Sequence, residues 1–151
     1  MLNIYGCDRR EAGLPHIIIE YSANLATRTD LRELMRKTHE TALATGVFEL
    51  AGLRTRCEER DIYRIADGHP DNSFVTVNIR IGHGRDEATR HRVGKAIFDC
   101  VCRHLAPIHA ATPIGITVDV AEIDPAASFK QNNMREIIRV RQERAASRAA
   151  E

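Results

Sequence analysis

The most restrictive feature of the sequence is a pattern that occurs twice along the chain. Each copy consists of a strand-like run, an amphipathic helical segment and a further extended segment. The second copy is the clearer one, because apolar and polar residues alternate over 73–82 as in a strand with one buried face. Apolar residues then recur at helical spacing from Val93 to Leu105, and a second strand-like run covers 114–123.

The first copy begins with PHIIIEYS, residues 15–22, a β-branched run that predicts a strand. Helical spacing follows over 31–43, with Thr29 or Asp30 as the N-terminal cap and Gly46 as the stop. This copy therefore also opens with a strand that leads into a helix with one apolar face.

The segment that closes the first copy is less regular. Residues 52–68 alternate loosely and predict one or two extended segments with an irregularity between them, and HPDN at 69–72 predicts a turn. Two tandem β-α-β units predict an α+β fold, in which a mixed sheet carries two helices on one face. The crossovers are right-handed if the strands within a unit are parallel.

Length and composition fit one compact domain. A chain of 151 residues has the usual size of a single domain, and 43% hydrophobic with only 5% aromatic residues predicts a mainly aliphatic core. We assign residues 15–134 to this domain, 1–14 to an N-terminal extension and 135–151 to a charged C-terminal helical tail.

The charge balance argues against a general nucleic-acid binder. The chain has 22 Lys and Arg against 21 Asp and Glu, whereas binding to nucleic acid depends on net positive charge. The tail is rich in Arg, but Glu residues alternate with them, which favours a solvated helix over nucleic-acid binding. The balance still allows a few arginines to converge on a small anionic ligand.

Cysteine usage and hydropathy predict a soluble cytoplasmic protein. The four cysteines form no C-x-x-C motif and are interpreted as reduced, structural thiols. Residues 1–14 lack the apolar core of a signal peptide, and no run of the sequence approaches the ~20 apolar residues of a membrane span.

Common catalytic motifs are missing from the sequence. It contains no P-loop and no G-x-S-x-G, and its seven histidines are scattered, which argues against a metal site. The segment 82–85, Gly-His-Gly-Arg, joins a predicted strand to a predicted helix, so its backbone N–H groups can face an anion. Arg85 can bind a carboxylate through two hydrogen bonds, or it can be an ordinary surface residue.

Several separated stretches resemble one known family. Residues 15–20, PHIIIE, are similar to the opening of the tautomerase superfamily, whose members use an amino-terminal proline as the catalyst. ATGVFELAGLRTR (44–56), IADGHPDNSFV (65–75), IGHGRDEATR (81–90) and FKQNN (129–133) resemble 5-carboxymethyl-2-hydroxymuconate isomerase, of the homoprotocatechuate (4-hydroxyphenylacetate) degradation pathway. The resemblance implies two pseudo-symmetric β-α-β units, assembled as a homotrimer with active sites near subunit interfaces.

The resemblance also implies a site and a reaction. The catalytic proline of the family falls on Pro15, and its two active-site arginines fall on Arg54 and Arg85. Pro15 would catalyse a 1,3-proton shift from enol to ketone, while Arg54 and Arg85 bind the carboxylates of the substrate, with no metal or cofactor. An α-amine has a pKa near ~8, and neighbouring positive charge or burial lowers it toward neutral pH, where a general base works best.

The chain departs from the family in that fourteen residues precede Pro15. An internal proline nitrogen is an amide without a basic lone pair. Leu14 offers a solution, because some bacterial genes start at CTG or TTG codons that encode Leu elsewhere, and removal of the initiator Met would expose Pro15. The alternative is a catalytically silent, tautomerase-like trimer that binds small anions or acts as a scaffold, in which Pro15 only opens a strand.

Overall fold

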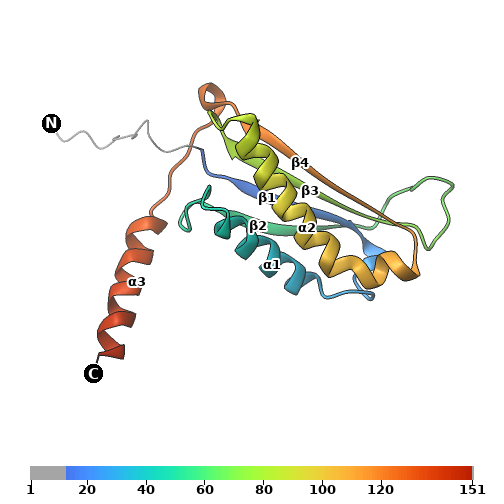
Figure 1. Ribbon diagram of the computed structural model, residues 1–151, viewed down its shortest axis with the longest axis horizontal. Coiled ribbons are helices and arrows are strands. Elements are labelled where there is room, and N and C mark those ends of the chain that lie inside the picture. The colour runs from blue at the N-terminus through green and yellow to red at the C-terminus, as the bar shows by residue number, and fades with distance from the viewer. Residues whose placement is uncertain (1–12, 151) are drawn as a thin grey trace.

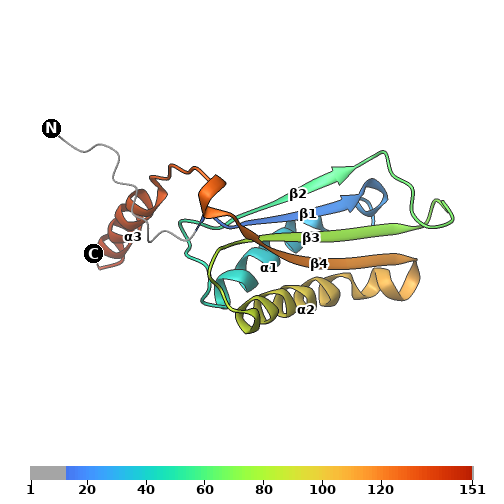
Figure 2. The ribbon, with the colours of Figure 1, turned by 90° about the horizontal axis from the view of Figure 1, so that it is seen from above.

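The computed structural model describes residues 13–150, which form a four-stranded mixed sheet with two helices on one face (Figures 1 and 2). The predicted α+β fold is therefore confirmed. The elements in chain order are β1 (His16–Ser22), a short 3-10 turn (Ala23–Leu25), α1 (Leu31–Ala44), β2 (Arg54–Arg60), β3 (Ser73–Gly82), α2 (Glu87–Ala111), β4 (Ile114–Ile123), a second 3-10 turn (Pro125–Ala127) and α3 (Met134–Ala149).

The strand order is β2-β1-β3-β4, and it reflects the tandem repeat. β1 and β2 are parallel, as are β3 and β4, so each β-α-β unit supplies one parallel pair. The two units meet where β1 runs antiparallel to β3, with Ile17 opposite Ile79. Because of this antiparallel contact, the start of β1 lies beside the end of β3.

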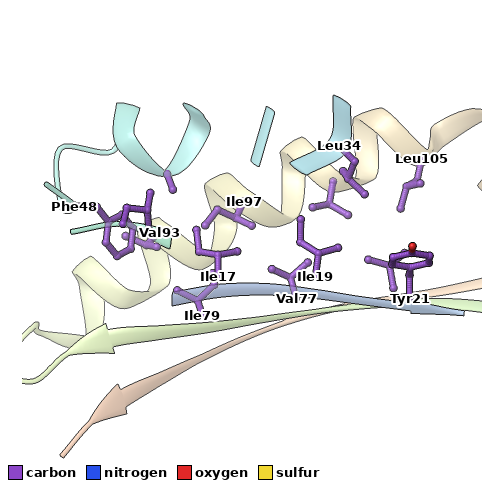
Figure 3. Packing of buried hydrophobic residues seen from close by; sticks show 14 of the residues in the cluster. Ile17, Ile19, Tyr21, Leu34, Phe48, Val77, Ile79, Val93, Ile97 and Leu105 are labelled. Atoms are coloured by element: carbon purple, nitrogen blue, oxygen red, sulfur yellow. The ribbon is translucent and has the colours of Figure 1, made fainter. Parts of the chain in front are cut away.

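The hydrophobic core lies between the sheet and the two helices (Figure 3). Alternate residues of β1 and β3 point toward the helices, and the apolar faces of α1 and α2 cover them. Asp30 caps α1 by accepting a hydrogen bond from the Glu33 N–H at 2.9 Å, and Asp86 caps α2 through the Thr89 N–H at 2.8 Å. Fully buried side chains include Ile17, Ile19, Leu34, Val77, Ile79, Val93, Ile97 and Leu105.

Two parts of the chain add detail to the sequence pattern. The loosely alternating segment contains a single strand, β2, followed by a loop over 61–72 that ends in the predicted turn, where the Asn72 N–H donates to the His69 carbonyl. The second helix does not end at Pro107, which lies just beyond its buried stripe, but continues to Ala111. Pro107 has no N–H to donate to the carbonyl of Arg103, four residues earlier. Both residues are exposed, so water can bind that carbonyl instead.

The opposite face of the sheet is not covered by a helix, and α3 projects away from the sheet (Figures 1 and 2). The side chains that alternate with the core residues of β1 face this open side: His16, Ile18 and Glu20. α3 contains no buried residue. Within residues 13–150, none of the helices has the length and apolar character needed to cross a membrane.

Candidate active site

A small cavity of about 150 Å³ lies at the end of the sheet where β1 begins and β3 ends. Pro15 and Arg85, which are 70 positions apart in the sequence, both line it. The antiparallel pairing of β1 with β3 explains this proximity, because His16 is opposite Arg80 and the turn after β3 therefore returns to Pro15. The full lining is Gly13, Leu14, Pro15, Val47, Phe48, Glu49, Ala51, Gly52, Gly82, Arg85, Asn132 and Arg135.

Pro15 is buried and held in place by both of its neighbouring segments. Its carbonyl accepts a hydrogen bond from the Arg54 N–H at 3.2 Å, which extends the pairing of β1 with β2. Its ring lies against Gly52, where an added Cβ would be 3.7 Å from the Pro15 Cδ. Gly13 and Leu14 line the same cavity, so the residues that precede Pro15 lie against the space next to its nitrogen.

Arg85 lies in the turn between β3 and α2. Gly84 in this turn has φ +93°, a conformation that favours glycine, and Asp86 caps the helix immediately afterwards. Arg85 is half-buried, and no hydrogen bond or ion pair joins its side chain to another residue in the described range 13–150. Its guanidinium group is therefore available to a carboxylate in the cavity.

Arg54 does not line the cavity, although it lies next to it. Its Nη1 donates a hydrogen bond to the Gly52 carbonyl at 2.6 Å, and its place in β2 directs it to the open face of the sheet beside His16. Arg54 thus supports the cavity wall at Gly52. Of the three site residues predicted from the sequence, the structure brings Pro15 and Arg85 together in the cavity and places Arg54 at its margin.

The surroundings of His16 show the electrostatic character of this end of the sheet. Burial is the first cause that lowers the pKa of His16, and the positive charges of Arg56, Arg54 and Arg80 lower it further. The neutral ring accordingly lies within hydrogen-bond distance of Arg56, with its Nδ1 3.2 Å from the Arg56 Nη1.

Besides Pro15 and Arg85, none of the lining residues was predicted as a site residue, and those with aromatic, amide or charged side chains are Phe48, Glu49, Asn132 and Arg135. Asn132 lies within the FKQNN stretch that carries the family resemblance, so the sequence contained a signal for it. Arg135 belongs to the segment whose composition predicts a solvated tail, and the weak apolar pattern of α3 gives no reason to single it out. Among the residues that the structure describes, no group of three or more metal-binding side chains is close enough together to hold a metal ion.

Comparisons with known proteins show the family to which the chain belongs. The family model described as 5-carboxymethyl-2-hydroxymuconate isomerase matches residues 15–138. The chain is 35% identical over 121 residues to the 5-carboxymethyl-2-hydroxymuconate Delta-isomerase of Escherichia coli, a match that covers 80% of this chain and 96% of that protein.

Solved structures give the same result at the level of the fold. A 5-carboxymethyl-2-hydroxymuconate isomerase from Deinococcus radiodurans R1 has a TM-score of 0.78 at 29% identity, covering 84% of this chain and 96% of that one. A further 5-carboxymethyl-2-hydroxymuconate delta-isomerase also has a TM-score of 0.78, at 27% identity, covering 84% and 94% of the two chains. By both its sequence and its fold, the chain belongs to the 5-carboxymethyl-2-hydroxymuconate isomerase family.

Proposed function

We propose that this protein is an isomerase that converts 5-carboxymethyl-2-hydroxymuconate, or a similar unsaturated 2-hydroxy polycarboxylate, from its enol to its ketone form in aromatic catabolism. Membership of the family supports this assignment. The observation that carries it is the meeting of Pro15 and Arg85 in one small cavity.

The proposed reaction is a proton transfer in which Pro15 acts first as base and then as acid. The amine of an N-terminal proline takes the proton of the 2-hydroxyl group, the electron pair of that bond forms the carbonyl, and the double bond of the enol shifts. The protonated amine then returns a proton to carbon, which regenerates the base. Arg85 binds a carboxylate of the substrate, and the charge of Arg54 helps to lower the pKa of the amine below its ordinary value of ~8.

This mechanism requires a free amine at Pro15, so we propose that the active form begins at Pro15. In the 151-residue chain the nitrogen forms an amide bond with Leu14. The position of Gly13 and Leu14 on the cavity wall supports the proposal, because these residues lie beside the nitrogen that the substrate must reach. The family match also begins at residue 15.

The test compares three forms of the protein at equal concentration: the full chain, a form that begins at Leu14, and a form that begins at Pro15 after removal of Met. Mass spectrometry verifies each N-terminus, and the assay follows ketonisation of 5-carboxymethyl-2-hydroxymuconate. We expect activity from the Pro15 form and almost none from the other two. The Leu14 form is the matched control, because it separates acylation of the nitrogen from loss of residues 1–13.

Equal activity in the three forms would exclude the proline mechanism. A verified Pro15 form that binds carboxylates without converting them would favour the second candidate, a non-catalytic protein that binds small anions. The half-buried Arg85 and the cavity beside it are compatible with that role.

We also propose that the protein assembles as a homotrimer. The uncovered face of the sheet and the exposed backbone edges of β2 and β4, its two outer strands, are surfaces that another subunit can cover. The cavity lies at the end of this sheet where β1 begins and β3 ends.

A further inference from the structure

The far wall of the cavity comes from the segment that leads into α3. The Asn132 side chain donates a hydrogen bond to the Ala51 carbonyl at 3.0 Å and accepts one from the Met134 N–H at 3.0 Å. The first bond attaches this segment to the loop after α1, and the second fixes the start of the helix. Arg135, in the first turn of α3, is thereby held over the cavity that contains Pro15.

Arg135 forms an ion pair with Glu49, which belongs to the loop after α1 and also lines the cavity. The two side chains are 60% and 70% exposed, so the pair lies at the mouth of the cavity rather than in its interior. An exposed ion pair contributes little free energy, and a carboxylate that enters the cavity can compete with Glu49 for the guanidinium group.

The charges that line the cavity match a substrate with several carboxylates. Among the residues described in 13–150, the cationic side chains on its wall are Arg85 and Arg135, because Arg54 is directed to the Gly52 carbonyl. Arg85 is half-buried, whereas Arg135 is exposed at the mouth. A dicarboxylate of the 2-hydroxymuconate type lacks the third carboxylate that the carboxymethyl arm provides.

We propose that Arg135 is a specificity-determining residue that binds the carboxylate of the carboxymethyl arm and so favours tricarboxylate over dicarboxylate substrates. This inference rests on the proposed function. Arg85 takes a carboxylate deeper in the cavity, near Pro15, and Arg135 takes the one at the mouth. Glu49 holds Arg135 in position while the cavity is empty and releases it when the carboxylate binds.

The test uses Arg135→Gln in the form that begins at Pro15, with 5-carboxymethyl-2-hydroxymuconate and 2-hydroxymuconate as the two substrates. We expect the ratio of kcat/KM between the tricarboxylate and the dicarboxylate to fall about tenfold or more, mainly through KM of the tricarboxylate. Arg135→Lys should restore part of this ratio. The matched control is Arg139→Gln, one helical turn further on, where Arg139 pairs with Glu136 and Glu143 outside the cavity and the ratio should not change.

Equal losses on both substrates would overturn the inference, since they would indicate a structural role for Arg135. A second measurement does not depend on catalysis: calorimetry of the full chain with propane-1,2,3-tricarboxylate and with glutarate. Arg135→Gln should weaken binding of the tricarboxylate about tenfold more than binding of glutarate. If the form that begins at Pro15, with Arg135 intact, converts neither substrate while the full chain shows this difference in binding, the proposed function fails and the role of Arg135 stands. If Arg135→Gln weakens binding of the tricarboxylate and of glutarate equally, the role of Arg135 is rejected, whether or not the protein is an isomerase.

Discussion

At the scale of single residues, the site depends on one cation with no competing protein partner. Arg85 is half-buried in the turn after β3, and its guanidinium group forms no hydrogen bond with other residues in the described part of the chain. Removing it should therefore affect ligand binding without breaking a contact that stabilises the fold.

We expect Arg85→Ala to reduce kcat/KM of the Pro15 form about ten- to hundredfold, because a charge-assisted hydrogen bond contributes ~1.5–3 kcal/mol. Steady-state kinetics with 5-carboxymethyl-2-hydroxymuconate measures the loss. Arg103→Ala, which removes an exposed arginine of α2 outside the cavity, is the control and should leave the rate unchanged. Unchanged activity in a folded Arg85→Ala protein would remove Arg85 from the site.

The sequence indicated Pro15 through the resemblance of PHIIIE to the family, and Arg85 through the same resemblance together with its glycine-containing turn before a helix. Arg135 has no such signal. It reaches the cavity only because Asn132 is bonded to Ala51, 81 positions earlier in the chain, and no local pattern encodes that contact.

At the scale of the elements, the periodic patterns predicted the strands and helices well, because one face of each central element is buried in the same core. β3 shows strict alternation, and α1 begins at the expected cap, Asp30. α2 passes through Pro107 because tertiary packing of its earlier turns outweighs the local cost of the proline. The partners of each strand were less predictable, since pairing depends on distant segments.

One element contains a polar group that its surroundings do not satisfy. Thr38 of α1 is fully buried, and its hydroxyl has no hydrogen-bond partner among the residues described. We expect Thr38→Val, which keeps the shape, to raise the free energy of unfolding by about 1 kcal/mol because it removes an unpaired buried hydroxyl. Urea unfolding followed by circular dichroism measures the change.

Thr55→Val in β2 is the matched control for this substitution. The Thr55 hydroxyl lies 2.9 Å from the His39 Nδ1 and forms a hydrogen bond with it, so its removal should give no gain in stability. A loss of stability in Thr38→Val would show that its hydroxyl makes a favourable interaction.

At the scale of the whole molecule, the two faces of the sheet differ sharply. The aliphatic residues lie under α1 and α2, which cover one face of the sheet (Figure 2), whereas the charged and polar side chains around Ile18 lie on the open face. Ile18 lies near the middle of this face, between Arg56 of β2 and Asn78 of β3.

We expect light scattering to give a mass of three times the 17.0 kDa of one chain. If subunits meet through the open face, Ile18→Glu should shift the protein toward the monomer, because the new carboxylate would lose its hydration in an interface where an apolar side chain now lies. Ala106→Glu, on the exposed side of α2, should keep the full mass. A wild-type monomer at micromolar concentration would contradict the proposed assembly.

The bond between Asn132 and Ala51 has a consequence for the order in which the protein acquires its parts during synthesis. The ribosome releases the amino-terminal side first, so β1 and the loop after α1 emerge long before residues 132–135. All four strands and every buried residue of the core precede this segment. A nascent chain can thus complete the hydrophobic interior described here while the cavity beside Pro15 still lacks one wall. The core can therefore fold before the cavity is able to bind a ligand, because the cavity is completed only when the first turn of α3 is in place.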